Sequence, residues 1–152
     1  MDQRALARKN IEKRLSPLRN MATQRPQRGW IRAIREALGM TTEQLAKRIG
    51  VSQPRVIALE KAETEDVVML KTLRKAAAAM DCELVYALVP RRPLDDVVRA
   101  RAERRAEDEL ARLHHTMQLQ NQALTAADLT AERKRMVESL IDGPARRLWD
   151  DT

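Results

Sequence analysis

Two side chains in one short stretch of the sequence have the chemistry that reads DNA bases. Gln53 can form two parallel hydrogen bonds with adenine, and Arg55 can form two with guanine. Both follow Ser52, a residue type that often begins a helix. These side chains would reach base edges only if a helix carried them into the major groove, so their use depends on the elements around them.

The stretch from Thr41 to Lys61 predicts two short helices separated by a tight turn. Thr41 has the spacing of a capping box with Gln44, and Gly50 can take the left-handed conformation that ends a helix. Pro54 fits the first turn of the second helix, because a missing N–H costs nothing there. Apolar residues supply the inner sides of the helices and the turn: Leu45, Ala46, Ile49, Val51, Val56, Ile57 and Leu59. This outline is that of a helix-turn-helix, although an ordinary helical hairpin in a bundle would share it.

The same stretch resembles the Cro/repressor-type, or Xre-like, helix-turn-helix family. The resemblance is carried by Leu45-Ala46, Gly50-Val51-Ser52-Gln53, Val56 and Leu59-Glu60. Many members have Gln where Thr42 stands, and that Gln contacts phosphate and braces the Gln that reads bases. Thr42 can still reach a phosphate, as Ser52 can, so both are expected to bind the DNA backbone while Gln53 and Arg55 read bases.

The residues before the helix-turn-helix are basic. Residues 2–20 predict a helix, which either docks on the core or forms an arm that becomes ordered on DNA. Residues 21–29 predict a linker in which Arg25 and Arg28 flank Pro26. These two arginines could hold backbone phosphates or enter a minor groove, but exposed linker arginines are often only solvated charge.

Two more helices should complete the bundle. Residues 29–39 predict a helix with Arg32 and Arg35 facing outward, where they can touch the DNA backbone. Its expected buried stripe is Trp30, Ile31, Ile34 and Leu38. Residues 70–80 predict the closing helix, so that five helices form the compact bundle expected of the family.

Residues 82–89, CELVYALV, predict one β-strand, because β-branched and aromatic residues concentrate there before Pro90. A single strand leaves backbone donors and acceptors unpaired. We therefore expect it to pair with its copy in a second subunit at a dimer axis, unless the segment is a short apolar continuation of the bundle.

From Pro93 onward the sequence predicts helices again, with Leu148 and Trp149 near the end as an anchor on the core or on a partner. The expected fold is mainly all-α: a five-helix repressor-like bundle with one strand at about 82–89 and a C-terminal helical extension. The expected parts are residues 1–28 (basic helix and linker), 29–90 (DNA-binding domain with strand) and 91–152 (helices for dimer or partner contacts).

Composition narrows the class of protein. The net charge is +7, and residues 1–35 hold ten Lys/Arg but only two Asp/Glu, which favours a polyanionic partner such as double-stranded DNA. The single cysteine, Cys82, fits a reducing cytoplasm, and no secretory signal or membrane span is evident. No phosphate-binding Gly loop, Cys/His ligand cluster or nucleophile motif occurs, so we expect no catalytic site, metal or cofactor.

A closer resemblance covers most of the chain. GWIRAIREALGM, the helix-turn-helix, LKTLRKAAAAMDCELVYALVP and the ending DGPARRLW are similar to the family called mobile mystery protein A. That resemblance implies a regulator from bacterial mobile elements, encoded beside a Fic-domain partner, mobile mystery protein B. The resemblance implies an autorepressor of a toxin–antitoxin-like operon, and the predicted strand and helix-turn-helix favour a homodimer that binds an inverted-repeat operator. The alternative is an antitoxin that acts mainly by binding the Fic-domain protein.

Overall fold

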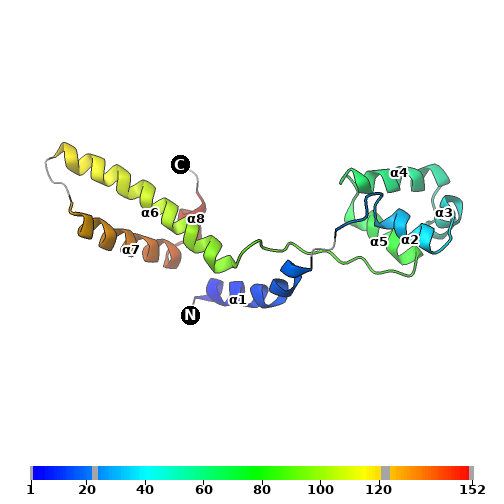
Figure 1. Cartoon of the computed structure of the whole chain (residues 1–152), viewed down its shortest axis with the longest axis horizontal. Helices are drawn as coiled ribbons and strands as arrows, with labels where there is room; N and C mark the ends of the chain where they lie inside the picture. Colours follow the sequence, from blue (N-terminus) through cyan, green and yellow to red (C-terminus); the bar gives the residue numbers. More distant parts are fainter. Residues whose placement is uncertain (1, 22–23, 121–123, 151–152) are drawn as a thin grey trace. The chain divides into compact units, whose positions relative to one another are not determined.

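The computed structural model describes residues 2–21, 24–120 and 124–150, and its regular elements in that part of the chain are helices (Figure 1). The α-helices are α1 (Gln3–Leu15), α2 (Trp30–Ala37), α3 (Thr42–Ile49), α4 (Gln53–Thr64), α5 (Leu70–Ala79), α6 (Leu94–Leu119), α7 (Ala126–Asp142) and α8 (Ala145–Trp149). A 3₁₀ helix, Ser16–Asn20, continues α1. These elements form two compact units, residues 22–87 and residues 1–21 with 88–152.

The unit of residues 22–87 is a bundle of α2, α3, α4 and α5 around a small aliphatic core. Leu45 and Val56 are fully buried, so that α3 and α4 pack through their apolar faces. Local signals set the helix ends. The Thr41 hydroxyl and the Gln44 side chain form both bonds of a capping box, and Gly50 ends α3 with φ 84°. The helix-turn-helix predicted from Thr41 to Lys61 is therefore present.

The other unit is organised around α6 and α7, which lie side by side (Figure 1). Its core consists of small and aliphatic residues from these helices and α8: Ala102, Ala106, Val137, Leu140 and Leu148. Helix α1 docks on this unit, because Arg8 pairs with Asp95 at 2.5 Å and Glu12 accepts the Leu94 N–H at 3.3 Å. Of the two alternatives for residues 2–20, the structure shows the docked helix, and it docks on the unit of α6 and α7.

The strand predicted at residues 82–89 is wrong for the single chain. The described residues of this segment are extended but belong to no strand, and Val85 and Leu88 are 83% and 88% exposed. The physical reason is the lack of a partner, since a strand forms only where a second extended segment satisfies its backbone groups. Among the described residues, no other segment does so.

Some burial predictions on α2 and α4 are also wrong. Trp30 and Ile57 were expected in the core but are 43% and 54% exposed, and Leu38 is exposed as well. Arg35 was expected to face outward but is buried. The inward side of α2 is therefore rotated relative to the predicted stripe, with Ile31 and Arg35, one helical turn apart, pointing inward.

Candidate DNA interface

The two side chains predicted to read bases lie in the first turn of α4 and are exposed to solvent. Ser52 is the N-cap residue, Gln53 begins the helix, and Arg55 follows within the first turn. Gln53 and Arg55 are both exposed. Because Val56 faces the core with no exposed surface, the helix is held from below while its first turn projects outward.

Thr42 braces the side chain of Gln53. The Gln53 amide nitrogen, Nε2, donates to the Thr42 hydroxyl across a distance of 2.8 Å. This contact joins the first residues of α3 and α4 and fixes the direction of the amide. It leaves the amide oxygen and the second N–H free, the pair that adenine N6 and N7 require. The threonine thus performs the bracing that the family resemblance attributes to a glutamine at this position.

Arg55 is the second candidate reader. Within the described part of the chain its guanidinium makes no hydrogen bond or ion pair, although its backbone N–H bonds to Ser52 at 3.1 Å. An arginine without internal partners can turn both terminal N–H groups toward the N7 and O6 atoms of guanine.

The predicted phosphate-binding residues lie in different places. Thr42 and Ser52 stand at the N-terminal ends of α3 and α4, where helix dipoles favour anions, and the Ser52 side chain makes no capping bond. Arg28 is exposed just before α2.

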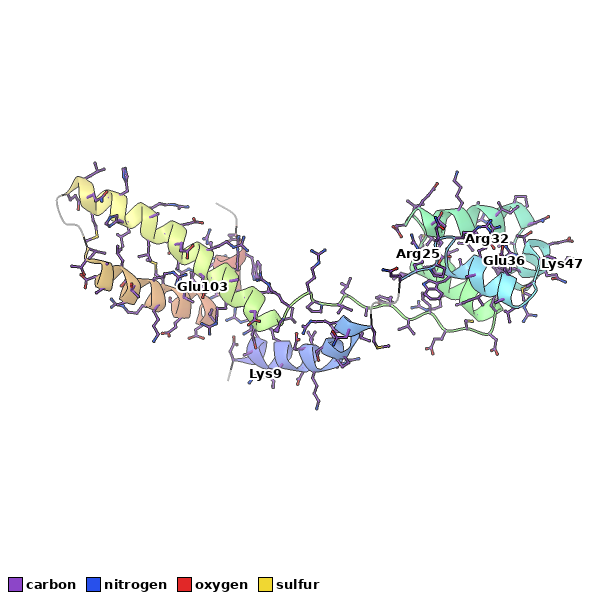
Figure 2. The ribbon with its side chains drawn as sticks, in the orientation of Figure 1. Lys9, Arg25, Arg32, Glu36, Lys47 and Glu103 are labelled. Atoms are coloured by element: carbon purple, nitrogen blue, oxygen red, sulfur yellow. The ribbon has the colours of Figure 1, made fainter. Side chains whose placement is uncertain are left out.

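Arg25 lies at the opposite, C-terminal end of α4 (Figure 2). It donates to the carbonyl oxygens of Glu63 at 2.7 Å and Thr64 at 3.2 Å, and it pairs with Asp66. Arg25 therefore caps the C-terminal end of α4. Phosphate binding by Arg25 stays a prediction, and a phosphate would have to replace these contacts.

A buried ion pair that the sequence reading missed positions α4. Arg35 of α2 donates to both carboxylate oxygens of Glu60, at 2.5 and 3.2 Å, and to the Met40 carbonyl at 2.9 Å. Both side chains are only 9% exposed. Hydrogen bonding to Glu60 raises the pKa of Arg35, so the guanidinium remains charged. The sequence signal that could have indicated this pair is Glu60, an acidic residue on the inward side of α4.

A second carboxylate of α4 caps α2. Glu63 accepts the backbone N–H groups of Trp30 at 2.8 Å and Ile31 at 3.0 Å. Gly29 allows this approach, because a Cβ atom there would lie 2.7 Å from the Glu63 carboxylate and the residue has φ 86°. Together Glu60 and Glu63 fix the inward face of α4 against both ends of α2.

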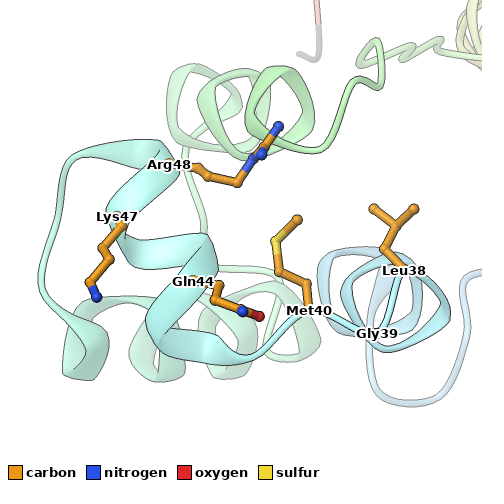
Figure 3. A pocket seen from close by; sticks show the side chains of 6 residues that line it. All are labelled: Leu38, Gly39, Met40, Gln44, Lys47 and Arg48. Atoms are coloured by element: carbon orange, nitrogen blue, oxygen red, sulfur yellow. The ribbon is translucent and has the colours of Figure 1, made fainter.

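Two open hollows lie on this unit. One, of about 450 Å³, is lined by Leu38, Gly39, Met40, Gln44, Lys47 and Arg48 (Figure 3). Arg48 there donates to the Ala79 carbonyl at 2.7 Å, which ties α3 to α5. The other, of about 310 Å³, lies between α4 and the residues around the start of α2. The described residues hold no cluster of three His, Cys, Asp or Glu side chains suited to a metal ion.

Helices α3 and α4 thus form a helix-turn-helix in which the first turn of the second helix is exposed. Comparison with known families agrees, since residues 31–86 match the family described as helix-turn-helix and form a domain of the Xre-like type. This is a family of DNA-binding regulators that are typically not enzymes. No curated protein and no solved structure matched the chain. The resemblance to mobile mystery protein A stays a prediction.

No helix in the described ranges combines the length and the apolar character needed to cross a membrane.

Proposed function

We propose that this chain is a sequence-specific DNA-binding transcriptional regulator. The observation that carries the proposal is the bond between Gln53 and Thr42 at the open end of α4. It orients an exposed amide beside an arginine that has no partner among the described residues. Fixing an exposed side chain adds little to the stability of the fold. It does favour DNA binding, because a side chain that is already oriented loses less conformational freedom when it contacts a base.

In this proposal α4 enters the major groove with its N-terminal turn leading. Gln53 reads an adenine and Arg55 reads a guanine, while Thr42, Ser52 and Arg28 contact the flanking phosphates. The bound duplex would place its negative charge against the positive ends of α3 and α4.

The test uses full-length protein and a duplex enriched by that protein from random-sequence DNA. Arg55→Ala should weaken binding by about 1–3 kcal/mol, roughly 5- to 150-fold, and remove the preference at one base pair. Arg74→Ala, an exposed arginine on α5, is the matched control and should leave that preference unchanged. Equal affinity and equal selectivity for Arg55→Ala and the parent protein would remove Arg55 from the interface.

We further propose that the regulator acts as a homodimer joined through residues 82–89. This segment exposes Val85, Tyr86 and Leu88, and it is already extended. Two copies lying antiparallel would satisfy each other's backbone groups and cover these side chains. Two helix-turn-helix units related by a twofold axis would then read an inverted repeat, with half-sites about 34 Å apart.

Light scattering coupled to size-exclusion chromatography tests this contact. Val85→Pro removes one backbone donor and should shift a dimer toward the monomer. Val85→Ala is the matched control, because it shortens the same exposed side chain but keeps the backbone N–H, so it should leave the backbone pairing in place. A parent protein that is monomeric at micromolar concentration would refute the homodimer.

The resemblance to mobile mystery protein A supports a narrower proposal, autorepression of a toxin–antitoxin-like operon. A second candidate function is an antitoxin that binds a Fic-domain protein. The observation favouring it is a separate helical unit with its own core, residues 1–21 and 88–152, which exposes Leu119 and Trp149.

Arg55→Ala separates these two roles. A pure autorepressor should lose repression of a reporter driven by its own promoter. An antitoxin that acts by binding protein should still suppress the toxicity of the adjacent gene product and still co-purify with it. Loss of both activities, in a variant that folds normally, would show that protection depends on DNA binding.

A further inference from the structure

The outward side of α4 carries an apolar side chain that neither the fold nor the proposed reading of bases uses. Ile57 lies one helical turn after Gln53 and is 54% exposed, although isoleucine in a small domain is usually buried. Its neighbour Val56 is fully buried, and Glu60 and Glu63 also face inward. Ile57 therefore belongs to the face that would meet DNA.

The spacing places Ile57 beyond Gln53 along the same helix. Four residues of α-helix advance about 6 Å, and residues at i and i+4 share one side. Base pairs are about 3.4 Å apart along the duplex, so Ile57 would meet a base pair one or two steps from the one that Gln53 contacts. In the major groove the apolar feature of a base edge is the C5-methyl group of thymine.

The surroundings of Ile57 indicate what kind of partner covers it. Ile57 lines the hollow of about 310 Å³, whose rim includes Arg28, Arg32 and Lys61. Arg32 pairs with Glu36 at 2.7 Å (Figure 2), and the Lys61 amine lies 3.7 Å from Glu65, whereas the Arg28 side chain makes no hydrogen bond or ion pair with the described residues. Ile57 thus lies in a hollow with Arg28, whose guanidinium is open to an anion, so its surroundings suit a polyanion that presents a methyl group.

We propose that Ile57 determines specificity by packing against the methyl group of a thymine one or two base pairs from the one read by Gln53. The proposal rests on the proposed DNA-binding function and names one further contact within it. It assigns to Ile57 a preference for thymine that uracil, which lacks the methyl group, would not satisfy.

The test is a uracil scan of the duplex that full-length protein enriches from random-sequence DNA. Each thymine is replaced in turn by uracil, which removes one methyl group and preserves every hydrogen bond. At one position per half-site, affinity should fall about fourfold, the equivalent of ~0.8 kcal/mol for one buried carbon.

Ile57→Ala should bind the thymine duplex more weakly and no longer distinguish it from the uracil duplex at that position. Alanine keeps the helix, and because Ile57 is half exposed, circular dichroism should show an unchanged fold. Leu70→Ala is the matched control, since it truncates an exposed aliphatic residue on α5 and should retain the uracil penalty.

The outcomes separate this proposal from the function on which it rests. If no sequence is enriched, sequence-specific binding itself fails. If a sequence is enriched but every uracil is tolerated, DNA binding stands and the role of Ile57 is overturned. A uracil penalty that persists in Ile57→Ala would assign the methyl contact to another residue, such as the exposed Ala58, and would equally overturn it.

Discussion

Removing one member of the Arg35–Glu60 pair should be far more damaging than removing an exposed ion pair. Both side chains are 9% exposed, and the guanidinium contacts both carboxylate oxygens. Arg35→Met leaves the Glu60 carboxylate buried without its cation, a change that typically costs about 3–5 kcal/mol. For a domain of this size each kcal/mol lowers the melting temperature by roughly 4–8 °C, so a loss of at least about 12 °C is expected.

The companion variants make this prediction specific. Glu60→Met alone should be similarly destabilising, because it strands the Arg35 cation. The double variant should recover most of the loss, since methionines of similar length replace both charges together. Arg32→Ala, which breaks the pair with Glu36 on the same helix, should cost below about 1 kcal/mol, because those side chains are 33% and 48% exposed.

The assay can be confined to one unit, because the chain has only two tryptophans and Trp30 lies in the unit of residues 22–87. In a Trp149→Phe background, fluorescence during denaturant unfolding reports that unit. Single losses that simply add in the double variant would refute direct coupling between Arg35 and Glu60. So would a strong dependence of the losses on salt, because buried pairs are weakly screened.

Three further predictions concern the same contacts and the other unit. Gly29→Ala should destabilise the helix-turn-helix unit by about 1–3 kcal/mol in denaturant titrations, because φ is 86° and the new Cβ would lie 2.7 Å from the Glu63 carboxylate. Thr42→Val should weaken binding to the selected duplex about 3- to 10-fold and relax its adenine preference in anisotropy titrations, because the glutamine that begins α4 loses its brace. The side-chain hydrogen bond from Thr125, and then the bond from its backbone N–H, lower the pKa of Asp128 below 3.8. The capping contribution is therefore present above that pH and lost as the pH falls through the lowered pKa; in an NMR titration, Thr125→Ala should return the Asp128 pKa toward 3.8.

The helix-turn-helix could be predicted because its determinants lie close together in the sequence. The capping box of Thr41 and Gln44 involves residues three apart, and Gly50 ends α3 through its own backbone conformation. Such signals act within one helical turn, so all the interacting residues are neighbours in the sequence. Gln53 and Arg55 lie in the same local stretch, in the first turn of α4, and both are exposed.

Features that depend on distant partners could not be read in this way. Arg35 was placed on the outer face because periodicity treats arginine as a surface residue, yet Glu60, 25 positions later, neutralises it. The charge of residues 1–35 favoured a polyanionic partner, but the order of the residues could not show which unit carries it. Six of the ten Lys/Arg of residues 1–35 belong to residues 1–21, in the unit of α6 and α7. The strand predicted at residues 82–89 is absent for a related reason, since no described segment of the chain pairs with it.

The buried carboxylates of α4 fix the position of the helix, and its exposed face depends on that position. Glu60 and Glu63 bond to α2 at points that allow only one register, because a shift by one residue would turn both carboxylates out of reach and strand Arg35. Apolar packing alone would permit small slides of α4 at little cost. Such slides would displace Gln53 from Thr42 and from any base it reads, and positional errors of about 1 Å matter at such sites. The double Met variant should therefore keep its stability while losing discrimination between bases, a separation that restoring Arg35 and Glu60 together should reverse.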